Sequence, residues 1–222
     1  MIKLFQVYKR YGSATALDDI SLHIQPGEFV FLTGPSGAGK TTLLRIIFRE
    51  EVSTSGQVIV DGRHVSRLAR RMVPYHRRAI GSIFQDFKLL KNKTVSDNVA
   101  FPLRVRGVPP LEMKSRAYKL LQQVGLEDKR LRFPRELAGG EQQRGAVARA
   151  LITTPKIILA DEPTGNLDAE VALDVLKLLL EANRRGATIL LATHNPNLVA
   201  SIRNKRLLEL AGGRLVRNEV TA

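Results

Sequence analysis

The fold of this chain is decided by the stretch Phe29-Val-Phe-Leu-Thr-Gly-Pro-Ser-Gly-Ala-Gly-Lys-Thr41, which joins an apolar run to a glycine-rich loop. The run from Phe29 to Thr33 is typical of a short buried strand, and Gly34 to Thr41 match the phosphate-loop pattern of glycine, four residues, glycine, lysine and serine or threonine. The segment from Thr42 to Phe48 then has apolar residues on almost every side, as does a helix packed against a sheet. This order of strand, loop and helix predicts an α/β fold with a phosphate-binding site.

Each residue type in the loop has a physical role in holding an anion. Gly34, Gly37 and Gly39 leave room for several backbone N–H groups to point at one phosphate, and the helix that follows adds its positive N-terminal end. We expect Lys40 to reach the β- and γ-phosphates, and the Thr41 hydroxyl to ligate the Mg²⁺ that bridges them. The predicted cofactors are therefore ATP and Mg²⁺, and the predicted ATP-binding residues of the loop are Gly34, Pro35, Ser36, Gly37, Ala38, Gly39, Lys40, Thr41 and Thr42.

A second apolar run, Ile157 to Ala160, ends in two adjacent carboxylates, Asp161 and Glu162. Because α/β sheets bind ligands at the carboxyl ends of their parallel strands, we expect both carboxylates beside the phosphate loop. Asp161 would then hold the magnesium ion through water, and Glu162 would polarise the water that attacks the γ-phosphate. Adjacent acids after a strand are common on protein surfaces, so it is their combination with the phosphate loop that predicts ATP hydrolysis.

The remaining patterns predict a single domain over residues 1–222. Further strands are predicted at residues 2–8, 20–25, 56–61, 80–84 and 188–192, with a terminal hairpin over 206–217. Helical periodicity and terminal glycines predict helices at residues 111–124, 141–151 and 169–183. We therefore predict an α/β ATP-binding core with a parallel sheet at residues 1–87 and 154–222, and an inserted helical subdomain at residues 88–153.

Composition narrows the setting in which the chain works. No stretch approaches the roughly 18 uninterrupted apolar residues of a membrane-spanning helix. The segment Met1 to Arg10 lacks the apolar region and cleavage site of a signal peptide, and the absence of cysteine is compatible with a reducing compartment. These features predict a chain that is soluble by itself and cytoplasmic.

The net charge of +14 predicts attraction to nucleic acid, anionic lipid or acidic proteins. Much of this charge lies in a run without acidic residues, made up of Arg63, Arg67, Arg70, Arg71, Arg77 and Arg78, with His64 and His76 between them. Such a run is compatible either with a generic solvated face or with a surface that lies against phospholipid headgroups or a partner.

Several short motifs occur in the order found in one family of ATPases. After the phosphate loop come Gln85, the segment Leu137-Ala-Gly-Gly-Glu-Gln-Gln-Arg144, the pair Asp161-Glu162, the segment Asn166-Leu-Asp168, and His194. In this order the chain resembles an ABC-type ATPase cassette over essentially its whole length. The resemblance implies a RecA-like P-loop NTPase core with an N-terminal antiparallel β subdomain, beside the inserted helical subdomain.

The resemblance also implies roles for residues that local patterns do not single out. It implies that Tyr11 stacks on adenine, that Gln85 binds magnesium and reports nucleotide occupancy to a partner, and that His194 contacts the γ-phosphate as a catalytic residue. Asp168 would belong to a loop that crosses a dimer interface. Taken one by one, Tyr11 is also compatible with a half-buried aromatic residue, Gln85 with a polar strand end, and His194 with a structural histidine near a turn.

Cassettes of this family pair head to tail, so that each ATP lies between the phosphate loop of one copy and the signature segment of the other. The resemblance therefore implies a homodimer on ATP binding, with the signature acting in trans through Leu137, Ala138, Gly139, Gly140 and Glu141. The signature usually begins Leu-Ser-Gly-Gly, and Ala138 lacks the serine hydroxyl that would donate to the partner's γ-phosphate. Since a hydrogen bond to a charged group contributes roughly 1.5–3 kcal/mol, we expect reduced but not absent hydrolysis.

Single-cassette chains of this length usually serve a separate membrane subunit. Within the family, residues 73–86 and 89–100 look most like the ATPases of bacterial cell division, whose polytopic membrane partner is FtsX. That resemblance implies a peripheral position on the inner face of the cell membrane and regulation of septal cell-wall hydrolysis, with the basic run facing anionic phospholipid. Residues 161–168 are shared with the ATPases of lipoprotein release and macrolide efflux, which are the alternative within the family.

Two hypotheses from other classes are also considered. The basic charge invites a soluble ABC ATPase that acts on nucleic acid, but the chain lacks both the long coiled coil of DNA-repair members and the second cassette of ribosome-directed members. The alanine at position 138, in place of the usual serine, suggests a regulatory module that binds nucleotide without hydrolysing it. The presence of Lys40, Asp161, Glu162 and His194 argues against that module.

Overall fold

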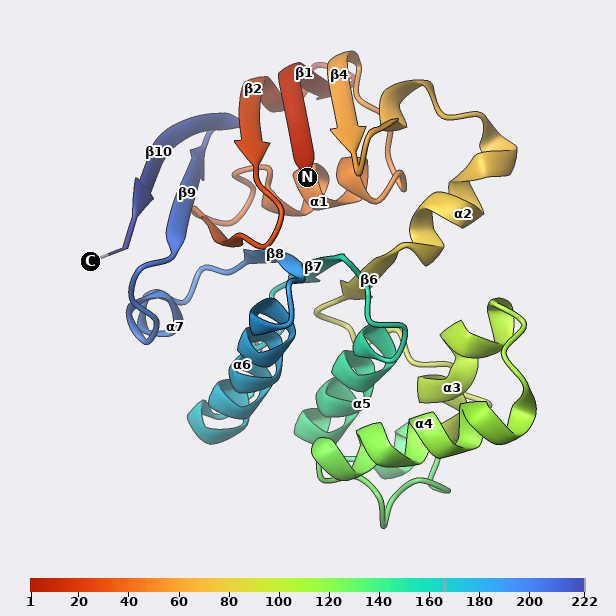
Figure 1. Cartoon of the computed structure of the whole chain (residues 1–222). Coiled ribbons are helices and arrows are strands. Elements are labelled where there is room, and N and C mark those ends of the chain that lie inside the picture. The colour runs from red at the N-terminus through yellow and green to blue at the C-terminus, as the bar shows by residue number, and fades with distance from the viewer. Residues whose placement is uncertain (166, 222) are drawn as a thin grey trace.

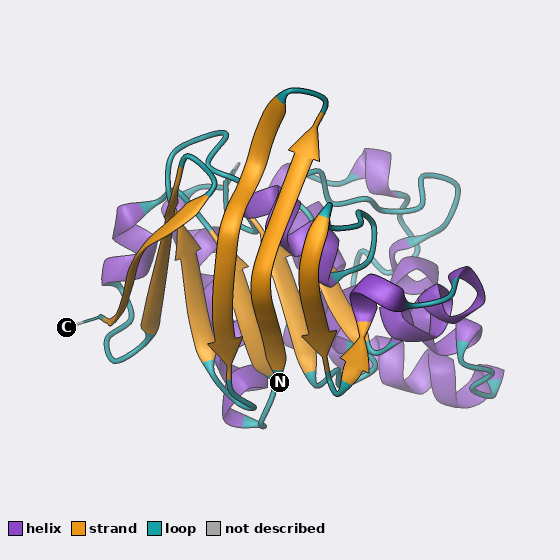
Figure 2. Cartoon of the chain, turned by 90° about the horizontal axis from the view of Figure 1, so that it is seen from above, coloured by secondary structure: helices purple, strands orange, loops and turns teal. Residues whose placement is uncertain are grey.

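The computed structural model describes residues 1–165 and 167–221, in which two β-sheets lie one above the other (Figures 1 and 2). The larger sheet has the order β10-β9-β3-β8-β7-β6, and the smaller has the order β2-β1-β4-β5. The strands of the larger sheet are β3 (Phe29–Thr33), β6 (Ile80–Ile83), β7 (Ile157–Asp161), β8 (Thr188–Ala192), β9 (Arg206–Ala211) and β10 (Arg214–Val220). The smaller sheet consists of β1 (Ile2–Tyr11), β2 (Ala14–Ile24), β4 (Ser55–Val60) and β5 (Arg63–His64).

The larger sheet is parallel from β9 to β6, with β10 added antiparallel at one edge. Strands of parallel sheets are buried on both faces and read as continuous apolar runs, which is the pattern of β3, β7 and β8. The smaller sheet is antiparallel throughout. The fold class predicted from the sequence and the resemblance is therefore confirmed, namely a P-loop NTPase core beside an antiparallel β unit.

Two hydrophobic clusters cover the larger sheet, one on each face. On one face, Val30 and Leu159 pack with helix α1 (Lys40–Ile47) and the apolar face of the smaller sheet. On the other face, Phe31 and Ile158 pack with helices α5 (Gly139–Leu151) and α6 (Ala169–Arg184). Figure 1 shows α1 between the two sheets and α5 and α6 on the far side of the larger sheet. Helix α1 is thus held from both sides, which fixes the loop that precedes it.

A third cluster lies within the segment that was predicted to be helical. It joins α3 (Val95–Val105), α4 (Pro110–Gln123) and one face of α5, with Leu103, Leu121 and Ala148 buried among them. Helix α3 was not predicted, because Pro102 interrupts its pattern and proline is unfavourable inside helices. Its start is nevertheless well defined, since the Thr94 hydroxyl caps it by accepting from the N–H of Asp97 at 3.1 Å.

The remaining elements are short. A connection of η1 (Val65–Arg67), η2 (Arg70–Met72) and α2 (Val73–Arg78) leads from β5 to β6, while η3 (Pro134–Glu136) precedes α5 and α7 (Pro196–Ala200) follows β8. The His76 ring is buried in this connection, with Nε2 2.8 Å from the carbonyl oxygen of Ile47. Burial lowers the pKa of His76, so the neutral ring donates to the last turn of α1.

Some predicted boundaries were wrong. Helix α5 begins at Gly139, so the glycine pair forms its first turn rather than preceding it, and α1 begins at Lys40 inside the phosphate loop. Strands β1 and β2 extend beyond the predicted ends because they form a long hairpin with register shifts, and β10 continues to Val220. Side-chain periodicity does not locate such ends, because the strands are extended by backbone hydrogen bonds across a hairpin, such as the pairing of Tyr11 with Ala14.

Candidate ATP-binding and catalytic site

The phosphate loop passes between β9 and the β1–β2 hairpin so closely that two of its glycines have no room for a side chain. A Cβ atom on Gly34 would lie 2.1 Å from the carbonyl oxygen of Leu210, and one on Gly39 would lie 2.5 Å from that of Ala16. Both residues also have positive φ angles, 134° and 105°, which L side chains rarely adopt. Glycine is therefore required at these positions by shape, and the loop is a preformed cradle.

Lys40 lies inside this cradle. Its side chain is buried, and Nζ donates to the carbonyl oxygens of Gly34 and Pro35 at 2.7 Å and 3.0 Å. These bonds hold the ammonium group at the mouth of the loop, where a phosphate bound by the backbone N–H groups would meet a positive charge. The contact of Lys40 with the β- and γ-phosphates stays a prediction.

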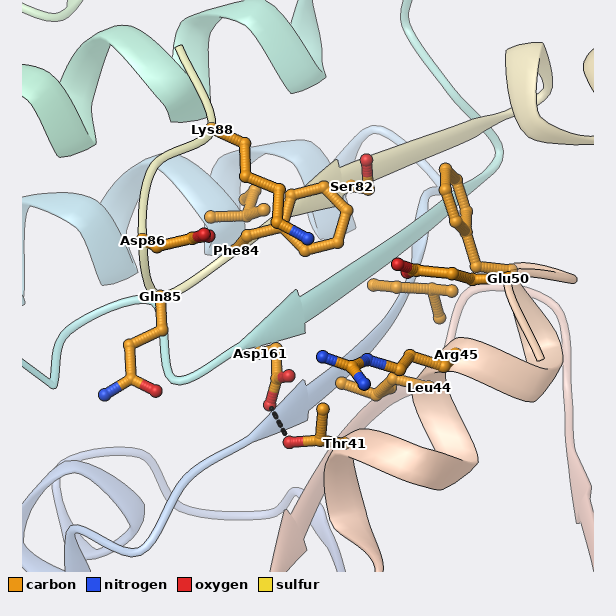
Figure 3. Close-up of a pocket in the computed structure, with 13 residues that line it drawn as sticks. Thr41, Leu44, Arg45, Glu50, Ser82, Phe84, Gln85, Asp86, Lys88 and Asp161 are labelled. Atoms are coloured by element: carbon orange, nitrogen blue, oxygen red, sulfur yellow. Dashed lines mark hydrogen bonds between the residues drawn. The ribbon is translucent and has the colours of Figure 1, made fainter. Parts of the chain in front are cut away.

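Thr41 and Asp161 come together although 120 positions separate them in the sequence. The hydroxyl of Thr41, on the first turn of α1, donates to Oδ1 of Asp161, at the end of β7, over 3.1 Å (Figure 3). Burial raises the pKa of Asp161, and this effect outweighs that of the Thr41 hydrogen bond, which lowers the pKa. The neighbouring charge of Glu162 also raises it.

The residues present fit a magnesium ion. A hydroxyl and a carboxylate side by side supply hard oxygen ligands, and Mg²⁺ commonly takes one or two protein ligands together with phosphate oxygens and water. Within residues 1–165 and 167–221 there is no cluster of histidine and acidic side chains sufficient to hold a metal by itself. A magnesium ion here would therefore depend on the phosphates of the nucleotide.

The Glu162 carboxylate and the His194 ring form a second pair beside the first. Nδ1 of His194 lies 2.8 Å from Oε1 of Glu162. The other oxygen, Oε2, is buried and has no hydrogen-bond partner in the described part of the chain. Glu162 has a φ of 47°, a conformation that costs energy for a residue with a side chain, and its N–H donates to the carbonyl of Ala192 on the neighbouring strand. The strained backbone thus aims a carboxylate with one free acceptor into the site.

Two adjoining cavities connect these groups. One, of about 590 Å³, is lined by the phosphate loop together with Ala16, Gln85, Glu162 and His194. The other, of about 400 Å³, has Thr41, Gln85, Asp161, Ser82, Phe84 and Lys88 among its lining residues, as Figure 3 shows. Gln85 and Thr41 line both, so the predicted residues from Pro35 to Thr42, with Gln85, Asp161, Glu162 and His194, are brought together.

Tyr11 lies at the tip of the β1–β2 hairpin, where it pairs with Ala14. It is not among the residues lining the two cavities, and the residue is 44% exposed. The ammonium of Lys9 lies 4.5 Å from the centre of the ring and also bonds Oε2 of Glu51 at 2.8 Å. The ring is thus held by a neighbour on the same strand while part of it stays open, and its role toward adenine stays a prediction.

The signature segment lies at the N-terminus of α5, and none of its residues lines the two cavities. Leu137 is buried, and Ala138 is the N-cap residue. The Ala138 N–H donates to Oε2 of Glu141 at 3.0 Å, but the methyl group of Ala138 cannot return the hydrogen bond that a serine would make. Glu141 also pairs with Lys129, and this hydrogen bond lowers the pKa of its carboxyl group. The signature of this chain therefore has half of the usual cap.

Asp168 has a local role that sequence reasoning missed. Its Oδ1 accepts from the N–H of Val171 at 2.9 Å, which caps α6. The cap could have been recognised from an aspartate just before a helical pattern. Asn166, quoted above as part of the same motif, lies outside the described residues.

Two further contacts behind the site were not predicted. Nε2 of Gln143 on α5 donates to the carbonyl of Pro163 at 2.6 Å, which ties the signature helix to the turn after Glu162. The guanidinium of Arg149 donates to the carbonyls of Phe87 and Lys88, which have positive φ angles of 59° and 46°. Neither contact has a local sequence signal, because the partners are far apart along the chain.

None of the helices in the described residues is long and apolar enough to cross a membrane.

The comparisons with known proteins agree with this geometry. A family model described as ABC transporter matches residues 17–165. The chain is 51% identical over 221 residues to the Cell division ATP-binding protein FtsE of Mycobacterium tuberculosis, covering 99% of this chain and 96% of that protein. It is 48% identical over 216 residues to the protein of the same name from Escherichia coli K12, covering 97% of each.

Solved structures of ABC cassettes have the same fold. The dimeric MJ0796 cassette in a post-hydrolysis state with ADP and Pi superposes with a TM-score of 0.93 at 36% identity, covering 100% of this chain and 99% of that chain. A second dimeric structure of MJ0796 gives a TM-score of 0.93 at 37% identity, with the same coverage. The phosphate loop, the pairing of Thr41 with Asp161 and of Glu162 with His194, and these matches together place the chain in the ABC transporter family, as an ATP-binding cassette that hydrolyses ATP.

Proposed function

We propose that this chain is the ATPase subunit of a membrane ABC-type complex that acts in bacterial cell division. The observation that carries the ATPase part is the meeting of Thr41 with Asp161 and of Glu162 with His194 at the carboxyl edge of one parallel sheet. The cell-division part is supported by relatives named Cell division ATP-binding protein FtsE at 44–51% identity over 97–99% of the chain.

In this proposal, Thr41, Gln85 and, through water, Asp161 would hold Mg²⁺ beside the phosphates of ATP. When bound, the ion supplies positive charge to the transferring phosphoryl group. Lys40 neutralises the phosphates inside the loop, Glu162 accepts a hydrogen bond from the attacking water, and His194 holds the Glu162 carboxylate and contacts the γ-phosphate. The ATP-binding set is completed by Tyr11, which stacks on adenine from the hairpin tip.

The proposed working unit is a homodimer formed on ATP binding. The signature residues, Leu137 to Glu141, lie away from the cavities of their own chain, which supports a role at the site of a second copy. There the N–H groups of Gly139 and Gly140 and the positive end of α5 would face the γ-phosphate. Asp168, which begins α6, would lie in the loop that crosses the interface. The dimeric MJ0796 cassettes support this arrangement by analogy.

An integral membrane partner of the FtsX type is proposed to dock beside the segment that contains Gln85. A cavity of about 410 Å³ lies there, lined by apolar side chains, including Phe84 and Phe101, and by basic ones, including Lys88 and Arg106. Because Phe84 and Lys88 also line the cavity that contains Thr41 and Asp161, a partner seated here would contact the wall of the catalytic site. Through such a partner, ATP turnover would regulate septal cell-wall hydrolysis.

The basic run is proposed to lie against anionic phospholipid. Its members differ in the structure: Arg77 is half-buried against the Phe48 ring and donates to the carbonyl of Arg49, whereas Arg63, Arg67, Arg70 and Arg71 are exposed. Each basic side chain near an anionic surface contributes on the order of 1 kcal/mol to binding. Vesicle co-sedimentation should fall when these exposed arginines are changed to glutamate, and a binding level independent of anionic lipid content would leave the run as an ordinary solvated face.

The function is tested by purifying the chain from membranes and identifying what comes with it by mass spectrometry. The expected partner is a polytopic membrane protein of the FtsX type. The Lys40→Ala variant should lose ATP binding but should still co-purify with this partner. Recovery of a lipoprotein-release or macrolide-efflux subunit instead would support the alternative within the family. Recovery of nucleic acid and no membrane protein would contradict the membrane assignment.

A further inference from the structure

A cavity of about 320 Å³ lies at the edge of the larger sheet opposite to the phosphate loop. Its wall includes Lys156, which precedes β7, and Ala187, which precedes β8, so it lies at the amino ends of strands whose carboxyl ends carry the catalytic groups. The other walls come from α4, the end of α5 and the last turns of α6. Its volume is within the range of small-molecule sites, about 300–1,000 Å³.

The floor of this cavity is apolar and incompletely buried. Leu120, Leu151, Leu178 and Ala182 line it and are only half-buried. Leu178 packs against both the cluster beneath the sheet and the cluster of the helical segment, so the cavity marks the seam between them. An apolar ligand that completed their burial would be stabilised by the apolar surface it removes from water.

The rim of the cavity is basic. Arg116, Lys119, Lys156 and Arg185 line it, whereas Glu181 is the one acidic lining residue among the described parts of the chain and is already paired with Arg185. Arg116 is held by the carbonyl of Ile152 at 2.9 Å. Neither Lys119 nor Lys156 has a carboxylate within ion-pair distance in residues 1–165 and 167–221. Unpaired ammonium groups beside an apolar floor complement a ligand with one anionic group and an apolar body.

We propose that this seam cavity binds a small amphipathic anion, such as a medium-chain carboxylate, with its apolar body on Leu120, Leu151 and Leu178 and its anionic group at Lys119 and Lys156. Such a ligand would contact α4 from the helical segment and α6 from the core at once. This proposal is independent of the membrane partner and of the cell-division role.

The test is calorimetric titration of the full chain with decanoate, with Mg-ADP present at saturation so that the phosphate loop is filled. Decanoate should bind in a one-to-one ratio and bind more weakly as salt is raised, whereas decylammonium, with the same chain and the opposite charge, should not bind. Undetectable decanoate binding, or equal binding of both compounds, would overturn the proposal.

Three variants locate the site. Lys119→Glu with Lys156→Glu should weaken decanoate about tenfold, since two favourable charge interactions become repulsive. Ala182→Phe should abolish binding by filling the floor. Lys114→Glu, on α4 but outside the cavity lining, is the matched charge control and should bind as the unchanged chain does. Unchanged affinity in both the double variant and Ala182→Phe, with circular dichroism and ADP binding intact, would show that decanoate binds elsewhere and refute the assignment.

Discussion

Nδ1 of His194 lies 2.8 Å from Oε1 of Glu162, so the residues that follow two neighbouring parallel strands form one hydrogen-bonded pair. This bond fixes one carboxylate oxygen, and the other, Oε2, is buried without a hydrogen-bond partner among the described residues. In the proposed mechanism Glu162 polarises the attacking water, and the pairing of strands in the sheet already holds its carboxylate in one position.

Replacing Glu162 with glutamine should slow ATP hydrolysis by at least about 100-fold, because an amide is a far weaker hydrogen-bond acceptor and base than a carboxylate. ATP binding should persist, since the phosphate loop is untouched, and the ATP-bound dimer should accumulate. Phosphate release and light scattering during gel filtration with Mg-ATP measure the two effects. Glu170→Gln, an exposed change on α6, is the control, and a Glu162→Gln chain with normal turnover would contradict the assigned mechanism.

Asp161→Asn should preserve or raise the stability of the folded chain while removing its ATPase activity. Burial raises the pKa of Asp161, so the folded state favours the protonated carboxyl group. The contribution of this group to the free energy of unfolding is therefore full at low pH. It declines as pH rises through the raised pKa. Without Mg²⁺, the asparagine variant should unfold at or above the temperature of the unchanged chain at neutral pH. The difference should vanish below about pH 4, the ordinary carboxyl range.

The same Asp161→Asn chain should lose magnesium-dependent turnover. Thermal unfolding in EDTA across pH, together with an ATPase assay, measures both properties. Asp174→Asn, at an exposed carboxylate paired with Lys177, provides the comparison. A variant that unfolds earlier than the unchanged chain at neutral pH, without Mg²⁺, would mean that the Thr41 hydrogen bond outweighs the burial of the charge.

Ala138→Ser should restore the missing half of the α5 cap and a donor toward the nucleotide of a second copy. A serine cap stabilises a helix by about 1 kcal/mol, which corresponds to roughly 2–4 °C in unfolding temperature for a chain of this size. The steady-state ATPase rate should rise several-fold. Ala138→Gly improves the cap without adding a hydroxyl, so it should raise stability alone, and an unchanged rate in Ala138→Ser would refute the expectation.

Lys9→Met should weaken the hold on Tyr11. The ammonium over the ring also bonds Glu51 and the carbonyl of Val52, so the ring has a fixed neighbour. Loss of an exposed cation–π contact, worth roughly 0.5–1 kcal/mol, should raise the KM for ATP about two- to fivefold and leave kcat unchanged. Lys3→Met, on the same strand, is the control. A fall in kcat at constant KM would place Lys9 outside adenine recognition.

The sequence by itself determined the phosphate loop, the order of strand, loop and helix, and the carboxylates at the end of β7. These are local signals, because glycine spacing, apolar runs and strand ends depend on neighbours within a few residues. The resemblance to ABC cassettes added Gln85, the signature and His194, which have no local signal of their own. The division into residues 1–87, 88–153 and 154–222 remains a prediction.

Only the tertiary structure decided which groups touch. The Thr41 hydroxyl meets Asp161, and His194 meets Glu162, because parallel pairing aligns the carboxyl ends of strands far apart in sequence. The glycine pair forms the first turn of α5, and α3 forms despite Pro102. Glu162 has a positive φ angle and donates its N–H to Ala192 on the neighbouring strand. Sequence patterns indicate whether a segment forms a helix, a strand or a loop. The distances between side chains depend on how segments far apart in the sequence pack together, and local patterns carry no information about that packing.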